Sequence, residues 1–306
     1  MKTIGITGGS GLVGSHLTNA LITKGYHVII FTRKKDNLLK KINVTFAFWD
    51  PKNEKCDTEA LKKLDAMVHL SGAGVSEKRW TKERKKEIAE SRIIGTHFLI
   101  EQLKLHAFNC KSFISASAIG FYGATVKNQK PFIETDSSST DFLGTICQQW
   151  EHEALNASSL MRTVIFRFGI VLAKENGAFP EFYNPLKYGI MPILGSGNQI
   201  MSWIHADDLA EMIAYAIQNT KMEGIYNAVS PKPANQKKII FTIARVMGGI
   251  KIPVFAPSFA LKILLGEMSI EILKSCNVSA RKIKDSGFVF KYPVLEDAIR
   301  AILLKY

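Results

Sequence analysis

A glycine-rich segment near the start of the chain constrains the fold most. The sequence TGGSGLVG at Thr7–Gly14 follows a short β-branched run and leads into apolar residues at helical spacing over residues 11–24. A dinucleotide-binding fingerprint requires this strand–loop–helix context. Gly8 would permit the tight turn, Gly11 would let the backbone approach a pyrophosphate, and Gly14 would let the helix pack on the strand. The helix N-terminus would then offer its free amides and positive dipole end to the phosphates.

The N-terminal half continues to alternate strands with helices. Apolar, β-branched runs predict strands at 27–32, 44–49, 65–70, 113–117 and 163–168, and helical periodicity predicts helices over 80–105 and 142–157. On the first of these helices we expect core positions at Ile88, Ile94, Phe98, Leu99 and Leu103. Continuous apolar strands separated by helices indicate a parallel sheet covered on both faces. The predicted fold is therefore α/β, a Rossmann-type doubly wound parallel sheet.

The rhythm changes after about residue 170, where Gly and Pro become frequent. We therefore assign residues 1–170 to a nucleotide-binding domain and 171–306 to a substrate-side, mainly helical region. A helix over 206–218 and a strand over 225–229 are also expected, and whether these elements return to the first domain stays open.

The chain carries 40 basic and 27 acidic side chains, a net charge of +13 over 306 residues. Residues 1–110 contribute 19 − 11 = +8, residues 111–220 contribute 7 − 10 = −3, and residues 221–306 contribute 14 − 6 = +8. An excess spread over both ends is typical of a solvated surface rather than a nucleic-acid groove. No apolar run is long enough to span a bilayer and no signal peptide is visible. Four scattered cysteines favour a reducing cytoplasm and exclude a zinc-type cluster. We thus expect a cytoplasmic monomer or homodimer that binds a small molecule, with no nucleic acid, membrane or metal.

The end of the second predicted strand indicates which nicotinamide cofactor fits. NAD-binding proteins usually place an acidic residue there for the ribose hydroxyls. This chain reads Thr32, Arg33, Lys34 and Lys35, with no acid before Asp36. A 2′-phosphate is dianionic and suits an arginine fork. The prediction is NADP(H), held chiefly by Arg33.

Several segments together resemble the extended short-chain dehydrogenase/reductase superfamily. They are similar, more closely, to an epimerase-like subfamily of NAD(P)-dependent epimerases, dehydratases or oxidoreductases that ends in a domain of unknown function. The matching segments are TGGSGLVGSHL (7–17), HLSGAGVSEKRW (69–80), ESRIIGT (90–96), ISASAIGFYG (114–123), RFGIVLA (167–173), LGSGNQIMSWIHADDLA (194–210) and GIYNAVSP (224–231).

The resemblance implies roles for individual positions. The cofactor would contact Thr7, Gly8, Ser10, Gly11, Leu12, Val13, Gly14, Thr32, Arg33, Ser71, Gly72, Ala73 and Arg92. Arg92 could equally form an ion pair with Glu87 or Glu90. Ser117 matches the Ser or Thr that binds the substrate oxygen in related enzymes, with Ser115 as the alternative register, and Tyr122 could reach the same pocket.

The chain departs from the superfamily at its acid/base pair. Catalytic members carry Tyr-x-x-x-Lys, in which the Lys and the cofactor ribose lower the Tyr pKa. By register, Leu143 and Cys147 stand at these two positions. Three interpretations follow. The protein is an NADP(H)-dependent oxidoreductase whose acid/base chemistry moved to Ser117, Tyr122, Cys147 or His205, or it is a non-catalytic NADP(H)-binding sensor. In the third, the register is displaced by one residue, although no displacement restores both the Tyr and the Lys.

Two further positions have competing interpretations. We favour a structural role for His205, with Asp207 or Asp208 capping the helix that follows. Arg167 could bind an anionic substrate group or pair with an acid.

Overall fold

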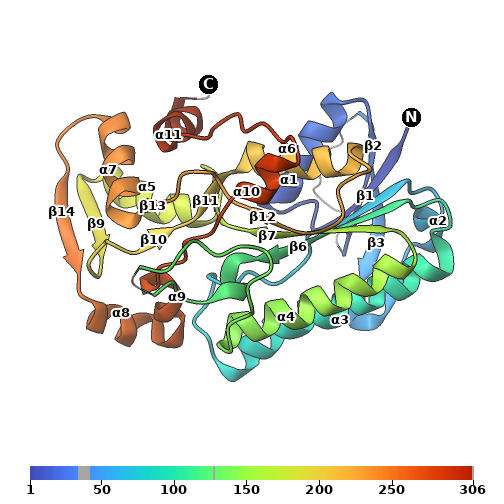
Figure 1. Ribbon diagram of the computed structural model, residues 1–306, viewed down its shortest axis with the longest axis horizontal. Helices are drawn as coiled ribbons and strands as arrows, with labels where there is room; N and C mark the ends of the chain where they lie inside the picture. The colour runs from blue at the N-terminus through green and yellow to red at the C-terminus, as the bar shows by residue number, and fades with distance from the viewer. Residues whose placement is uncertain (34–41, 127, 305–306) are drawn as a thin grey trace.

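An eight-stranded sheet forms the centre of the computed structural model, which describes residues 1–33, 42–126 and 128–304 (Figure 1). Its strands are β1 (Thr3–Thr7), β2 (His27–Thr32), β3 (Val44–Asp50), β4 (Lys55–Cys56), β5 (Ala66–His69), β6 (Ser112–Ala118), β7 (Arg162–Phe168) and β12 (Gly224–Ala228). They lie in the order β12-β7-β6-β5-β1-β2-β3-β4. All neighbours pair in parallel except β4, which is antiparallel to β3. The predicted doubly wound parallel sheet is confirmed.

Helices cover both faces of this sheet. Helices α1 (Leu12–Thr23) and α6 (Ala206–Gln218) lie on one face, and α2 (Thr58–Leu61), α3 (Lys82–His106) and α4 (Phe142–Leu155) lie on the other (Figure 1). Strand β2 shows why. Val28 and Ile30 belong to the cluster under α1 and α6, whereas Ile29 and Phe31 belong to the cluster under α3. The four buried side chains at 28–31 of β2 are therefore all apolar, as burial on both faces of the sheet requires.

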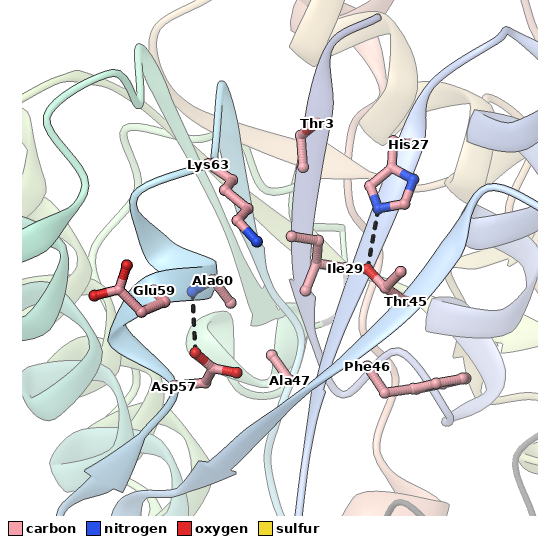
Figure 2. A pocket seen from close by; sticks show the side chains of 10 residues that line it. All are labelled: Thr3, His27, Ile29, Thr45, Phe46, Ala47, Asp57, Glu59, Ala60 and Lys63. Atoms are coloured by element: carbon pink, nitrogen blue, oxygen red, sulfur yellow. Dashed lines mark hydrogen bonds between the residues drawn. The ribbon is translucent and has the colours of Figure 1, made fainter.

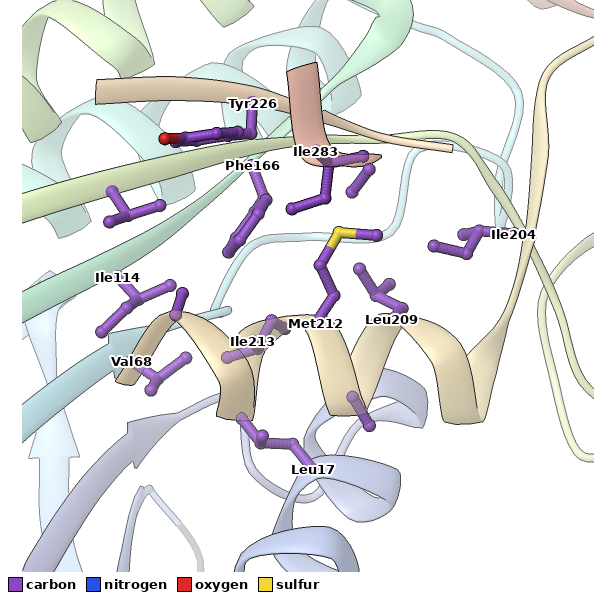
Figure 3. Close-up of a cluster of buried hydrophobic side chains, with 14 of the residues drawn as sticks. Leu17, Val68, Ile114, Phe166, Ile204, Leu209, Met212, Ile213, Tyr226 and Ile283 are labelled. Atoms are coloured by element: carbon purple, nitrogen blue, oxygen red, sulfur yellow. The ribbon is translucent and has the colours of Figure 1, made fainter. Parts of the chain in front are cut away.

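Helix α6 packs on the same face of the sheet as α1 and contributes many of the buried side chains there. Leu209, Met212 and Ile213 project from it toward the strands, while Leu17 of α1 approaches it from below (Figure 3). Strand β12, which follows α6, pairs with β7 in register from Gly224 to Ala228. The chain therefore returns to the eight-stranded sheet between residues 206 and 228, after an excursion into the C-terminal region.

The remaining elements form a second layered region beside the carboxyl ends of the strands. Its elements are β8 (Ile170–Leu172), α5 (Ala178–Lys187), β9 (Ile190–Leu194), β10 (Ile200–Met201), β11 (Trp203–His205), β13 (Ala234–Asn235), α7 (Gln236–Met247), β14 (Ile252–Ala256), α8 (Ser258–Leu265), α9 (Ser269–Leu273) and α11 (Leu295–Leu304). Helix α10 (Arg281–Asp285) packs instead on β12, where Ile283 joins the core under α1 and α6. Helices α5, α7 and α11 enclose a separate core. The mainly helical expectation missed the short strands, because β9 and β14 pair only with each other.

One expected core position is wrong. Ile94 is 50% exposed, whereas Ile88, Phe98, Leu99 and Leu103 are buried as predicted. Ile94 therefore lies on the solvent side of α3 rather than in the core under the sheet. No helix among the described residues is long and apolar enough to cross a membrane.

Candidate functional site

The phosphate-binding loop joins β1 to α1 at the carboxyl edge of the sheet. Gly8 has φ +68°, and a Cβ there would lie 2.8 Å from the Leu70 carbonyl carbon. A Cβ on Gly14 would overlap the Gly8 carbonyl oxygen and the Gly9 backbone. Both positions are sterically restricted to glycine. The loop geometry therefore agrees with the roles that the spacing predicts for these two glycines.

The N-terminus of α1 is open toward the space above the loop. Gly11 is its N-cap and is exposed, and no side chain of the residues that the structure describes caps the first turn. Its own N–H donates to the Gly8 carbonyl at 3.0 Å, which closes the turn. Ser10 is also exposed, and Leu12 and Val13 lie in the uncapped first turn. An uncapped helix N-terminus beneath a glycine cradle fits a diphosphate.

A buried relay of polar side chains supports this loop from beneath. The Leu70 amide and the Thr7 hydroxyl meet at 3.3 Å, and Thr7 Oγ1 lies 2.7 Å from His69 Nδ1. His69 Nε2 lies 3.0 Å from Thr96 Oγ1, which donates to the Arg92 carbonyl at 2.5 Å. The Thr96 hydroxyl uses its one hydrogen to donate to that carbonyl, so its oxygen accepts from His69 Nε2–H. His69 Nδ1 then carries no hydrogen and accepts from the Thr7 hydroxyl.

The relay fixes His69 in its neutral form. Complete burial, helped by the charge of Arg92, lowers the pKa of His69 to about 3. Thr7 was expected to contact the cofactor, but its hydroxyl is engaged here and its side chain is fully buried. Sequence reasoning missed His69. The one available signal was a histidine and two threonines at otherwise apolar positions of β1, β5 and α3.

The end of β2 presents Thr32 and then Arg33, which is exposed. Strand β2 lies directly beside β1 in the sheet, so Arg33 follows the strand next to the phosphate loop. The predicted contributions of Lys34 and Lys35 lie outside the described residues, as does Asp36. Arg33 is thus a described cation where dinucleotide-binding folds recognise the adenosine ribose.

Arg92 reaches from α3 to the backbone after β5. Its Nη1 donates to the Ala73 carbonyl at 3.0 Å and to the Ile88 carbonyl at 3.1 Å. A Cβ on Gly72 would lie 3.2 Å from Arg92 Cζ. The Ala73 amide also binds the same helix, since it donates to Ser91 Oγ at 3.0 Å. Segment Ser71–Ala73 is therefore held against α3.

The alternative ion pairs for Arg92 do not form. Glu87 pairs with Arg84 at 2.6 Å, and Glu90 pairs with Lys86 at 3.6 Å. No acid among the described residues forms an ion pair with Arg92. Helical geometry explains this, because both glutamates lie on the outer side of α3 with the exposed lysines.

A second buried network surrounds Ser117 at the end of β6. Ser117 Oγ donates to Glu151 Oε1 at 2.6 Å, and Arg167 binds both carboxylate oxygens, through Nε at 2.8 Å and Nη2 at 2.7 Å. These three side chains are only 2–3% exposed. Arg167 therefore pairs with an acid, one of its two predicted roles. Burial opposes its charge, but the bonds to Glu151 outweigh that effect and raise its pKa.

Tyr122 belongs to the same network. Its hydroxyl accepts from Arg167 Nη1 at 2.8 Å and donates to Asn227 Oδ1 at 2.7 Å. The Arg167 guanidinium also stacks 3.4 Å from the Phe121 ring centroid. Burial raises the pKa of Tyr122 to about 12, despite the neighbouring arginine. Glu151 and Arg167 thus link the hydroxyls of Ser117 and Tyr122 into one network, and each hydroxyl already has protein partners. Their catalytic roles stay a prediction.

Helix α4 presents Leu143 and Cys147 toward the loop after β6. A Cβ on Gly120 would lie 3.3 Å from Leu143 Cβ and 4.0 Å from Cys147 Sγ. The two residues lie one turn apart on the face that meets the site. Burial, followed by the charge of Glu151, raises the pKa of the Cys147 thiol to about 12. A thiol in that state is a poor proton carrier at neutral pH.

The start of α6 corrects one expectation. Neither aspartate caps the helix, because His205 is the N-cap and its Nδ1 accepts from the Asp207 amide at 3.0 Å. Asp207 instead binds His16 Nδ1 at 2.7 Å. Asp208 accepts the amides of Lys291 and Tyr292 at 2.7 and 2.9 Å. His205 therefore has the structural role that the sequence favours, and Asp208 anchors the C-terminal segment.

A separate hollow of about 270 Å³ lies at the other end of the strands (Figure 2). Thr3, His27 and Thr45 line it from the beginnings of β1, β2 and β3, and Asp57 and Lys63 line it from the α2 side. In open α/β sheets, ligands bind outside the carboxyl ends of the strands. This hollow is at the amino ends, and it contains none of the predicted site residues. No group of three His, Cys, Asp or Glu side chains in the described chain could hold a metal.

Comparison with known proteins extends over nearly the whole chain. The model of the NAD dependent epimerase/dehydratase family matches residues 4–228, and that of a domain of unknown function (DUF1731) matches residues 256–302. The epimerase family protein YfhF of Bacillus subtilis is 36% identical over 303 residues, covering 98% of this chain and 97% of that protein. An epimerase family protein of Staphylococcus aureus is 35% identical over 315 residues, covering 99% of each.

Solved structures share the fold. The human epimerase family protein SDR39U1 (isoform 2), solved with NADPH, superposes with a TM-score of 0.87 at 23% identity, covering 99% of this chain and all of that one. A UDP-glucose 4-epimerase from Thermotoga maritima, solved with UDP-glucose, gives a TM-score of 0.80 at 21% identity, covering 98% and 97%.

Proposed function

The chain belongs to the NAD dependent epimerase/dehydratase family, and we propose that it is an NADP(H)-dependent oxidoreductase of the epimerase type. Its substrate is a small molecule, which exchanges a hydride with the nicotinamide. The observation that carries the proposal is the end of β2, where Arg33 follows the strand next to β1 and the sequence has no acid before Asp36. The NADPH bound to the human relative supports the same choice.

Different residues bind different parts of the cofactor. The backbone of Ser10–Gly14 holds the diphosphate at the start of α1, and Arg33 holds the 2′-phosphate. Ser71–Ala73 and Arg92 line the path from the loop toward α4. When bound, the nicotinamide supplies hydride transfer. Ser117 and Tyr122 hold the reacting oxygen of the substrate, which must compete with Glu151 and Asn227 for their hydroxyls.

Titration of the purified protein with NADPH and NADH, followed by tryptophan fluorescence, tests the cofactor. We expect NADPH to bind more tightly, and Arg33→Ala to weaken NADPH binding by about tenfold or more while it changes NADH binding little. Arg281→Ala is the matched control, because Arg281 is an exposed arginine of α10, which lies against β12 at the opposite edge of the sheet. Tighter binding of NADH by the wild-type protein contradicts the proposal.

A specific observation favours a second function, a non-catalytic NADP(H)-binding sensor. Leu143 and Cys147 line the face of α4 next to Gly120, and the nearby hydroxyls of Ser117 and Tyr122 are already bonded. A panel of carbonyl compounds and sugar nucleotides separates the two functions. Oxidation of NADPH that slows in Ser117→Ala supports the enzyme. Tight NADPH binding without turnover on any member of the panel supports the sensor.

A further inference from the structure

Arg92 is a partly buried cation without an acidic partner in the described chain. A guanidinium has five N–H donors, and within the described chain Nη1 alone donates, to the carbonyls of Ala73 and Ile88. Nε and Nη2 form no hydrogen bond with the described residues. They are also absent from the described polar atoms that are sealed from solvent without a partner, unlike Arg84 Nε. These donors are therefore accessible to a ligand.

The guanidinium lies between the backbone after β5 and the inner face of α4. It is 3.2 Å from where a Gly72 Cβ would be, and Cζ is 5.2 Å from the Trp150 ring centroid. Its charge also acts on the Cys147 thiol, where it opposes the effect of burial on the pKa. Cys147 occupies the register position at which Tyr-x-x-x-Lys proteins carry their lysine. The arginine thus brings a positive charge from α3 to the position where α4 has none.

The accessible polar atoms of Arg92 are donors alone, because a guanidinium has no acceptor. Trp150 packs beside them but adds no donor to this surface, since its Nε1 is sealed from solvent. Both carbonyls that Arg92 does reach bind the same nitrogen. An oxygen-rich group is the complement of such a surface, since hydroxyls and phosphate oxygens accept from guanidinium. In a dinucleotide bound along Ser71–Ala73, the ribose next to the nicotinamide is such a group.

We propose that Arg92 replaces the missing lysine of α4, donating through Nε and Nη2 to the hydroxyls of the nicotinamide-side ribose. The inference rests on the proposed function, because it requires NADP(H) in the site. It assigns the two ends of the cofactor to two arginines: Arg33 binds the adenosine phosphate and Arg92 binds the distal ribose.

Two ligands separate the ends. NADPH contains the distal ribose, whereas 2′,5′-ADP contains only the adenosine end. Affinities for both are measured by isothermal titration calorimetry on the wild-type protein and on Arg92→Met, Arg92→Lys and Lys86→Met. Lys86 is the control, because it is an exposed cation on the same helix that pairs with the exposed Glu90. Thermal melts confirm that each variant is folded.

Arg92→Met should bind NADPH about tenfold to a hundredfold more weakly, as expected for a lost charged hydrogen bond, and bind 2′,5′-ADP within about twofold of wild type. Arg92→Lys keeps the charge but loses the fork, so its NADPH affinity should lie between the two, and it carries the test if Arg92→Met does not fold. Unchanged NADPH affinity, or equal losses for both ligands, overturns the proposal. Failure of the wild-type protein to bind either ligand instead overturns the proposed function.

A swap tests the replacement directly. Cys147→Lys in the Arg92→Met background returns a cation from α4 to the place that the arginine left. The double variant should recover at least about a third of the lost NADPH affinity on a logarithmic scale. Cys147→Lys alone should bind more weakly than wild type, because two cations then meet. A double variant no better than Arg92→Met overturns the idea that the two cations serve one position.

Discussion

Acidification should destabilise the protein through His69, the buried histidine beneath the phosphate loop. Its ordinary pKa of 6.5 falls to about 3 in the fold, because burial, assisted by Arg92, disfavours the charged form. Above pH 6.5 the histidine is neutral in both the folded and the unfolded chain, so its lowered pKa does not reduce the free energy of unfolding there. As the pH falls below 6.5 the unfolded chain binds a proton that the folded chain refuses, so stability is lost until about pH 3.

The size of the loss follows from these two pKa values. Between pH 7 and pH 4.5 the unfolded histidine becomes almost fully protonated, while the folded one stays neutral. The final pH lies about two units below the unfolded pKa of 6.5. At about 1.4 kcal/mol for each unit, the free energy of unfolding should fall by roughly 2–3 kcal/mol from this residue alone. Down to pH 3 the same reasoning gives an upper value of about 5 kcal/mol.

Urea unfolding at pH 7 and pH 4.5 measures this contribution as a difference between variants. His69→Gln keeps an acceptor and a donor for Thr7 and Thr96 but cannot titrate, so it should lose roughly 2–3 kcal/mol less than wild type over this interval. His27→Gln, at the start of β2 beside Thr45, is the control and should follow wild type. If His69→Gln loses as much stability as wild type, the buried histidine is not the source and the assignment of its neutral form is wrong.

Three other perturbations have defined outcomes. Glu151→Ala strands the buried Arg167 guanidinium and should cost about 3–5 kcal/mol in urea unfolding, whereas adding Arg167→Met should restore much of that loss; a cost below about 1 kcal/mol contradicts the buried pair. Gly14→Ala should abolish NADPH binding in calorimetry, because its Cβ overlaps the Gly8 carbonyl, and wild-type affinity refutes the cradle geometry. Asp208→Ala removes the acceptor of two backbone amides near Lys291, so the free energy of unfolding should fall by about 2–4 kcal/mol and limited proteolysis should begin in that segment; unchanged cleavage argues against the anchor.

The local elements of the sheet could be predicted because each strand and helix records its own surroundings. His27–Thr32 and Ala206–Gln218 agree with the structure to the residue, since burial on both faces demands continuous apolar strands and one-sided burial demands helical spacing. The short strands β9 and β14 were missed for the opposite reason. Their pairing joins residues some sixty positions apart in an isolated two-stranded sheet, and no local periodicity specifies that contact.

The candidate site divides in the same way. The phosphate loop is visible because three glycines and a strand–helix junction are close together in the sequence. The His69 relay could not be predicted, and neither could the choice of Glu151 as the acid that Arg167 binds, because the members come from separate elements and each residue alone has an ordinary type. Arg92 shows the intermediate case. Its position in a mainly buried helix predicted a partner, but only the structure shows that the nearby glutamates bind other cations.

The buried Glu151–Arg167 ion pair affects whether the protein can act as an enzyme. Residues 143, 147 and 151 recur at one-turn spacing, so they share the face of α4 that meets the ends of β6 and β7. On that face Leu143 cannot transfer a proton, the Cys147 thiol is held protonated by burial, and the Glu151 carboxylate is bound by both Ser117 and Arg167. Tyr122 is likewise committed, since Arg167 donates to its hydroxyl and Asn227 accepts from it. A proton donor on this face would have to break the network that fixes the loop after β6 to the sheet. The oxidoreductase and sensor proposals therefore differ on one measurable point, which is whether a substrate can displace Glu151 from Ser117.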